Sequence, residues 1–146
     1  MRCVQPLARD RAGSVAVEFA LLIPVLLGLM LGILQVGIGM QNYTALRSVS
    51  ADLARYAVVD AQASISRQSD EQLEAWARTR ATGRAYHLHG DGLTVDVADA
   101  ETQRVPGARE KTITLTYSIN SILGFVGMHD IAITYSRPIF LAPSAT

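Results

Sequence analysis

The sequence is poor in the residues that most metal, redox and catalytic sites need. It has one cysteine among 146 residues, Cys3, so the chain can form neither an internal disulfide nor a cysteine-rich zinc site. Glycine-rich phosphate loops and paired carboxylate motifs are also missing from it. We therefore expect no enzymatic activity and no cofactor.

Charge is balanced over the whole chain and missing from one long stretch. The 13 basic and 13 acidic residues give a net charge of zero, and no block of like charge points to nucleic acid. No charged residue occurs from Phe19 to Leu46, and Phe19 to Leu34 has no polar side chain. A helix needs roughly 20 apolar residues to cross the hydrocarbon core of a membrane. Extending the segment to Ile38 reaches that length, with Gln35 as its one polar residue, so the sequence predicts one transmembrane helix.

The residues around this segment indicate its orientation. Arg2, Arg9 and Arg11 against Asp10 precede it, which favours a cytoplasmic N-terminus. A removable secretory signal peptide is the other reading of a basic start before an apolar run. That reading needs a small-residue cleavage site directly after the run, and the sequence at 37–39 is a poor match.

The junction in front of the apolar run resembles a type IV prepilin processing site. A short basic leader ends at Gly13, Ser14 would begin the mature chain, and Glu18 would be its fifth residue, followed by Phe19. Together with Pro24, the phrase GSVAVEFALLIPVLLGLMLGI at 13–33 resembles the TadE-like family. These are minor pseudopilins of tight-adherence (Flp, type IVb) pilus systems. The resemblance covers about the first third of the chain.

The resemblance implies a structural and interaction protein of pilus assembly and adhesion. A prepilin peptidase would cut between Gly13 and Ser14, and the partners would be other pilins or pseudopilins, the pilus assembly platform and the membrane. The implied parts are a leader at 1–13, a transmembrane anchor at 14–40 and an extracytoplasmic pilin-like domain at 41–146. The anchor would sit in the inner membrane, with the C-terminal domain in the periplasm, outside the cell or in the pilus. The alternative function is an uncleaved, single-pass, membrane-anchored binding module of the cell envelope.

Glu18 is an ionisable residue at the edge of the apolar span. At the centre of a membrane helix an acidic side chain costs roughly 2.5–3.5 kcal/mol on insertion scales, so a partner cation would help. The resemblance to pilins suggests the new amine of Ser14 in an adjacent subunit. The alternative is that Glu18 only caps the positive end of the helix.

Small residues recur every four positions along the anchor. They are Ala16, Ala20, Pro24, Gly28 and Gly32. This spacing places them along one stripe, and the last two form a GxxxG pair that allows close helix packing. We expect a helix-packing face and a kink at Pro24, the alternative being a helix that is simply rich in glycine.

Spacings of three and four continue beyond the membrane, which predicts a single helix from about Ser14 to Val59. The predicted apolar face of its second half is Val36, Met40, Tyr43, Val49 (or Ser50), Leu53 and Tyr56.

A second helix is predicted to begin after Ser69, where Gln72 three residues later completes a capping box. It is predicted to end at Gly83. The expected buried face comprises Leu73, Trp76, Ala77 and Arg80.

The last third of the chain alternates with a period of two, which predicts three antiparallel strands with one buried face. The inward residues are Leu93, Val95 and Val97, then Ile113, Leu115 and Tyr117, then Ile131, Ile133 and Tyr135. The fold class is therefore α+β and pilin-like.

The connections between the strands carry further expectations. Val105 to Ala108 predicts a turn, and a short apolar helix is expected at Ile122, Leu123, Phe125 and Val126. Pro138 is expected to end the third strand, with a poorly ordered tail to Thr146.

Candidate chemistry outside the anchor is weak. His87 and His89 form an H-x-H pair, but a zinc site needs a third or fourth ligand and Asp91 is the one acidic neighbour. Ser121, His129 and Asp130 are the residue types of a catalytic triad, but any sequence of this length permits such a combination. We expect no metal site.

Overall fold

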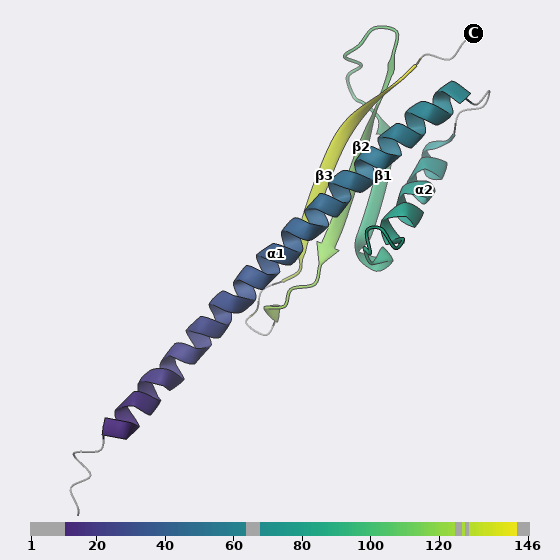
Figure 1. The fold of residues 1–146 in the computed structure, drawn as a ribbon. Coiled ribbons are helices and arrows are strands. Elements are labelled where there is room, and N and C mark those ends of the chain that lie inside the picture. Colours follow the sequence, from purple (N-terminus) through teal and green to yellow (C-terminus); the bar gives the residue numbers. More distant parts are fainter. Residues whose placement is uncertain (1–10, 64–67, 125–126, 128, 143–146) are drawn as a thin grey trace, which may run out of the picture.

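The computed structural model describes residues 11–63, 68–124, 127 and 129–142. Its elements are α1 (Arg11–Ala63), α2 (Asp70–Thr82), the short 3₁₀ helix η2 (Gly90–Gly92), β1 (Leu93–Asp99), β2 (Arg109–Ile119) and β3 (Ile131–Leu141). Figure 1 shows a long rod whose distal half lies against a three-stranded sheet, with α2 beside it. The predicted α+β arrangement is confirmed.

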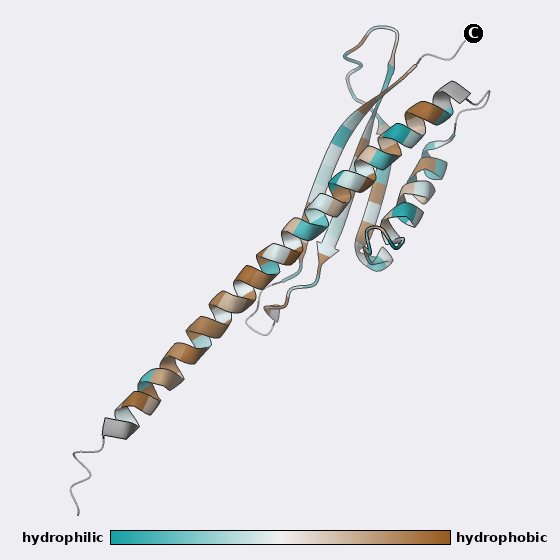
Figure 2. Ribbon diagram, viewed as in Figure 1, coloured by the Kyte–Doolittle hydropathy of each residue, from teal (hydrophilic) through white to brown (hydrophobic). Residues whose placement is uncertain are grey.

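Helix α1 has 53 residues and is therefore about 80 Å long. It begins before Ser14 and ends beyond Val59, so the predicted helix is confirmed and extended at both ends. Figure 2 shows that its N-terminal half is almost uniformly hydrophobic, whereas the half along the sheet mixes apolar and polar residues. The helix runs through Pro24 without interruption, and Figure 1 shows no sharp bend along the rod. The expected kink is not seen.

The predicted domain side of α1 is confirmed only in its distal part. Val49 and Leu53 are fully buried as predicted, together with Leu46, and Tyr56 packs against the core. The prediction is wrong nearer the anchor, where Val36, Met40 and Tyr43 are 63%, 69% and 44% exposed. From Phe19 to Met40 every side of the helix is apolar apart from Gln35. Spacing alone therefore cannot tell the side that faces the domain from the side that faces outwards.

Helix α2 is capped as its sequence predicts. The Ser69 Oγ accepts the N–H of Gln72, and the Gln72 Oε1 accepts the N–H of Ser69 at 2.9 Å. The helix buries Leu73, Ala77 and Ala81. The prediction of a buried Arg80 is wrong, because half of its side chain is exposed and it forms an ion pair with Asp52 on α1 at 3.1 Å.

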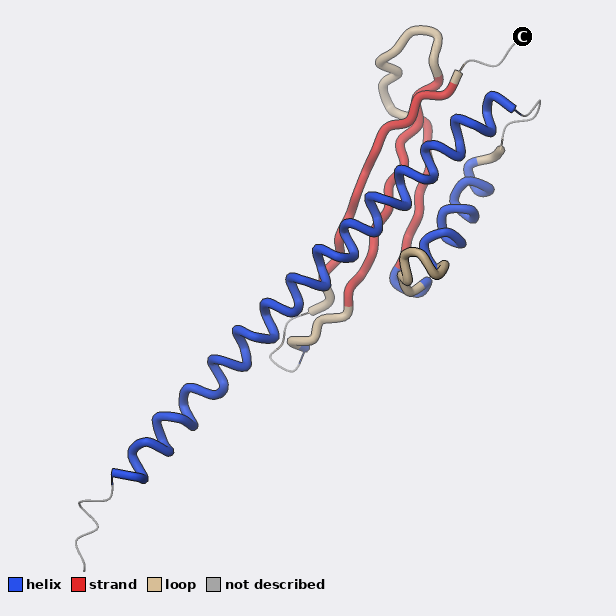
Figure 3. The backbone as a smooth tube through the Cα atoms, viewed as in Figure 1, coloured by secondary structure: helices blue, strands red, loops and turns tan. Residues whose placement is uncertain are grey.

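The sheet has the order β1-β2-β3 and is antiparallel throughout. Its inner face includes the predicted residues of β1 and β2, all of which are buried. Both helices contact the sheet, α1 chiefly β3 and α2 chiefly β1, and Figure 3 shows them on the same face. The outer face carries rows of hydroxyl side chains such as Thr94, Thr116 and Thr134, which are paired across the three strands.

The third strand is longer than predicted. Pro138 does not end it, because β3 continues to Leu141 and Pro138 pairs with Thr112. As an edge strand, β3 needs ladder hydrogen bonds on one side only, and proline is tolerated there. The buried residues of β3 are at its C-terminal end. Ile139 and Leu141 are buried there, whereas Ile131 at the start of the strand is 44% exposed.

The two strand connections are tight where they are described. The N–H of Ala108 bonds the carbonyl of Val105 at 3.2 Å, and Gly107 has a φ of +80°, so the predicted turn is confirmed and is of the type that requires glycine at its third position. The N–H of Gly124 bonds the carbonyl of Ser121 at 3.3 Å, which makes one turn. Phe125, Val126 and residues 143–146 lie outside the described residues.

Candidate functional site

The N-terminal half of α1 exposes an apolar surface that is interrupted near its start by Glu18. Its most apolar stretch has a mean hydropathy of 2.5, and none of it is buried inside the protein. The large exposed residues include Val15, Val17, Phe19, Leu21, Leu22, Val25, Leu26, Leu29, Met30 and Ile33. A soluble monomer rarely leaves so much contiguous apolar surface in water. Within the described residues this is the one helix long and apolar enough to cross a membrane, and it fits a membrane anchor.

Gly13 and Ser14 lie in the first turn of α1, which begins at Arg11. The first four N–H groups of a helix have no intrahelical partner, and glycine costs about 1 kcal/mol of helix propensity relative to alanine. The peptide bond between the two residues is therefore in the part of the helix that unwinds most easily. A Cβ added at Gly13 would meet no atom within 4 Å, so the fold of the chain does not itself require glycine there.

Glu18 and Phe19 are both exposed on α1. Because α1 begins at Arg11 and has no acidic residue in its first turn, Glu18 lies about two turns into the helix. Capping of the helix end, which acts within the first turn, does not apply to Glu18 in the full-length chain. Removal of residues 1–13 would bring Glu18 to one turn from the new N-terminus, on the same face as Ser14.

The small-residue stripe is open over most of its length. Ala16, Ala20, Pro24 and Gly28 are exposed, and Gly32 is half-buried. Positions four apart follow a ridge that is inclined to the helix axis, so the stripe winds around α1 rather than running straight. A Cβ added at Gly28 or Gly32 would meet no atom within 4 Å, which leaves the backbone there accessible to another helix.

Gln35, which the sequence marks only as an interruption of the apolar run, connects α1 to the domain. It is 6% exposed, and its Oε1 accepts the N–H of Ile122 at 2.9 Å. Its buried Nε2 has no hydrogen-bond partner among the described residues. The signal that could have identified this contact is the cost of a polar side chain in an apolar span, which normally requires a partner.

Further along α1, aromatic and charged contacts fix α2 in place. The rings of Tyr56 and Trp76 stack with centroids 4.5 Å apart and planes at 5°. The Asp52 carboxylate accepts hydrogen bonds from Arg80 Nε at 3.1 Å and from the Tyr86 hydroxyl at 2.9 Å. Burial and the bond to Asp52 raise the pKa of Tyr86. These contacts make the distal half of α1 an integral part of the domain.

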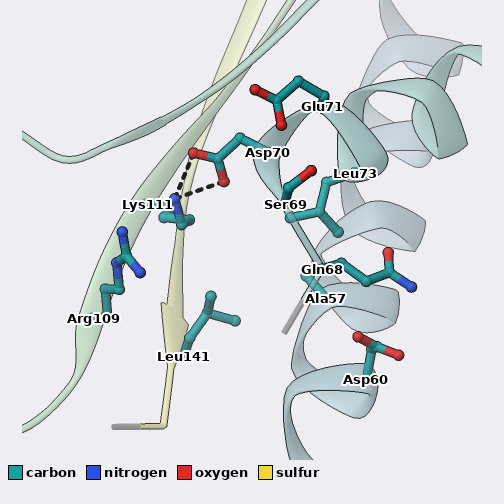
Figure 4. A pocket seen from close by; sticks show the side chains of 10 residues that line it. All are labelled: Ala57, Asp60, Gln68, Ser69, Asp70, Glu71, Leu73, Arg109, Lys111 and Leu141. Carbon is teal, nitrogen blue, oxygen red and sulfur yellow. Dashed lines mark hydrogen bonds and ion pairs between the residues drawn. The ribbon is translucent and has the colours of Figure 1, made fainter. Parts of the chain in front are cut away.

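A cavity of about 290 Å³ opens where α1 ends and α2 begins, facing the ends of β2 and β3. Figure 4 shows Lys111 pointing across it to Asp70. Lys111 is 5% exposed and bonds both Asp70 oxygens at 2.7 and 2.8 Å and Asp99 at 3.0 Å. Arg109 holds Asp99 through two further bonds at 3.0 and 2.7 Å. Because these cations are already paired with carboxylates, the network is suited to holding α2 and β1 against β2 rather than to binding an anion.

Hydrogen bonds from Arg109, then from Lys111, lower the pKa of Asp99 to about 2. A second paired carboxylate, Glu110, is 1% exposed and accepts bonds from the side chain and the backbone N–H of Arg104. These bonds lower the pKa of Glu110. Both carboxylates are therefore ionised partners that hold the distal end of the sheet.

The histidine pair and the three residues considered as a catalytic triad lie in loops, outside the helices and strands. His87 and His89 are exposed and border an open hollow with Asp91. Within the described part of the chain, no three His, Cys, Asp or Glu side chains are grouped as metal ligands. Asp130 accepts the backbone N–H of Ser121 at 3.1 Å.

Comparison with known protein families gives a match on α1. Residues 13–55 match the model of the family described as TadE-like protein. The matched segment lies wholly within α1 and stops before α2 and the sheet. No curated protein and no solved structure matches the chain.

Proposed function

Because residues 13–55 of this chain are TadE-like, we propose that it is a minor pseudopilin of a tight-adherence (Flp, type IVb) pilus system. TadE-like proteins are structural components of pilus systems rather than enzymes. One observation carries the proposal: the family match falls on the helix that exposes a membrane-length apolar surface at one end and is built into a small domain at the other.

The proposed arrangement follows the chain. Residues 1–13 form a cytoplasmic leader, 14–40 the anchor in the inner membrane, and 41–146 the pilin-like domain outside it. The continuous α1 supports this order, because it joins the exposed anchor directly to the buried residues around Leu46 and Leu53. The partners are the prepilin peptidase, other pilins or pseudopilins and the assembly platform.

Processing is proposed between Gly13 and Ser14. A membrane peptidase must reach this bond in an extended conformation, and glycine in the first helical turn lowers the cost of unwinding it. Absence of a steric need for glycine at position 13 favours a role in recognition over one in folding.

Assembly is proposed to use Glu18, Phe19 and the small-residue stripe. After trimming, the Ser14 amine of the same chain lies one turn from Glu18, and the amine of a neighbouring subunit is the alternative partner. An ion pair in a low-dielectric environment is costly to break from one side. Pairing with the amine of a neighbouring subunit would therefore fix the register of the anchor helices, whereas pairing within one chain would not.

The experiment that tests the proposal compares trimming of the full-length protein with and without a prepilin peptidase. Intact mass should show a chain that starts at Ser14 when the peptidase is present and one that starts at Met1 when it is absent. Gly13→Leu should block trimming without affecting insertion. Gly37→Leu is the matched control, because Gly37 also has open space around it on α1, and it should be trimmed normally.

A Met1 start in the presence of an active peptidase would contradict the proposal and favour the uncleaved binding module. Trimming that continues in the strain without the peptidase would also contradict it.

A further inference from the structure

The β2–β3 connection meets α1 at Gln35, near the outer end of the proposed anchor. The N–H of Ile122 donates to Gln35 Oε1 at 2.9 Å, although the two residues are far apart in sequence. Figure 1 shows the described part of this connection at the end of the sheet nearer the anchor, beside α1. The position of Gln35 relative to the membrane therefore fixes the position of this connection.

The length of the exposed helix sets that position. Residues 19–34 have no polar side chain, and α1 buries none of its most apolar stretch. Glu18 and Gln35, at either end of this stretch, are about 26 Å apart along the helix, close to the thickness of the hydrocarbon core. Gln35, buried against the domain, then lies at the outer boundary of that core.

The surface presented there suits lipid headgroups. The sequence has no charged residue between Lys111 and His129, and Ile122 and Ile131 are 36% and 44% exposed. Asp130 accepts the Ser121 N–H at 3.1 Å, and a carboxylate is tolerated among headgroups but is costly in hydrocarbon. Contact is thus limited to the interfacial layer.

We propose that Ile122, after the end of β2, and Ile131, at the start of β3, form a membrane-resting surface that seats the domain on the outer headgroups of the bilayer that holds α1. The occupant is the lipid surface itself, because Ile122 is hydrogen-bonded to Gln35 at the outer boundary of the hydrocarbon core. The hydrogen bond between the Ile122 N–H and Gln35 holds this surface at the outer end of the anchor. This inference rests on the proposed function, since it requires α1 to be in a membrane.

Depth-dependent fluorescence quenching tests this surface. The full chain carrying Cys3→Ser would be labelled with an NBD fluorophore at Ile122→Cys, Met30→Cys or Val105→Cys and inserted into phosphatidylcholine–phosphatidylglycerol vesicles. Spin labels would be placed either near the lipid headgroup or deep in the acyl chain. Met30 is 61% exposed on the anchor, and Val105, at 45%, is an equally apolar control at the opposite end of the domain.

We expect the headgroup label to quench NBD at Ile122 strongly and the deep label to quench it weakly. Met30 should be quenched by the deep label, and Val105 by neither. Quenching at Ile122 no greater than that at Val105, with Met30 still quenched, would overturn the membrane-resting surface but leave the anchor intact. Loss of quenching at Met30 as well would instead contradict the membrane anchor of the proposed function.

Discussion

Two polar side chains, Glu18 and Gln35, mark the two ends of the apolar part of α1. They are about 26 Å apart along the helix, close to the thickness of the hydrocarbon core. Glu18 is exposed, whereas Gln35 is buried against the domain. One therefore remains available to a partner outside this chain, and the other is already used to attach the anchor to its domain.

Asp99 gives a prediction for the dependence of stability on pH. Its carboxyl pKa is about 2 in the folded protein, against an ordinary value of 3.8. As the pH falls through 3.8 towards 2, the unfolded chain binds a proton that the folded chain does not, so the stabilisation present above 3.8 is lost. The effect is reduced by solvent, because half of the Asp99 side chain is exposed.

The measurement is the urea midpoint of the full chain in detergent at about pH 6 and about pH 3. The wild type should lose more stability between these values than Asp99→Asn, which has no carboxyl group to titrate. Equal losses in the two proteins would show that the Asp99 ion pairs do not contribute.

At the scale of the elements, the domain depends on how α2 docks on α1. Trp76→Ala should lower the free energy of unfolding by about 2 kcal/mol, because it removes both a half-buried ring and its stack on Tyr56. Urea unfolding followed by circular dichroism would measure this loss, since Trp76 is the one tryptophan. Tyr56→Phe keeps the stack and should cost less than about 1 kcal/mol for the lost hydroxyl contact with Gln68. Equal losses of stability in Trp76→Ala and Tyr56→Phe would show that the ring stack does not contribute.

Local chemistry explains which elements could be predicted from the sequence. The capping box at Ser69 and the alternation in β1 and β2 depend on neighbouring residues, and the structure contains both. The side of α1 that faces the domain depends on residues far away in the sequence, so spacing alone places Val36 and Met40 on the wrong side. The expected strand end at Pro138 is wrong for a similar reason, since edge position is a property of the whole sheet.

The candidate site shows the same division. The apolar span is a local pattern, and α1 contains it. The junction at Gly13 is also a local pattern, and its cleavage stays a prediction. The bond between Gln35 and Ile122 joins residues far apart in the chain, and no spacing in either segment indicates it. The start of α1 at Arg11 places Glu18 beyond the first helical turn, where it does not cap the helix. The hydrophobic pattern does not predict this starting residue.

At the scale of the whole molecule, the protein is a rod with two distinct surfaces. The distal half of α1 packs against its own domain, while residues 13–30 are exposed and leave the small-residue stripe open from Ala16 to Gly28. A molecule built in this way is suited to associating with similar helices in a membrane and to holding a small domain outside it. The central claim is that this association uses the stripe and depends on Glu18.

Cysteine crosslinking in pilus-producing cells tests that claim most directly. In a Cys3→Ser background, Gly28→Cys lies on the stripe, and Leu26→Cys is a control at nearly the same depth that points about 200° away. A thiol crosslinker should join position 28, but not position 26, to other pilins or pseudopilins. Adding Glu18→Ala should abolish the crosslinks at position 28 while leaving the protein in the membrane. Equal crosslinking at both positions, or crosslinks at position 28 that survive Glu18→Ala, would contradict the account.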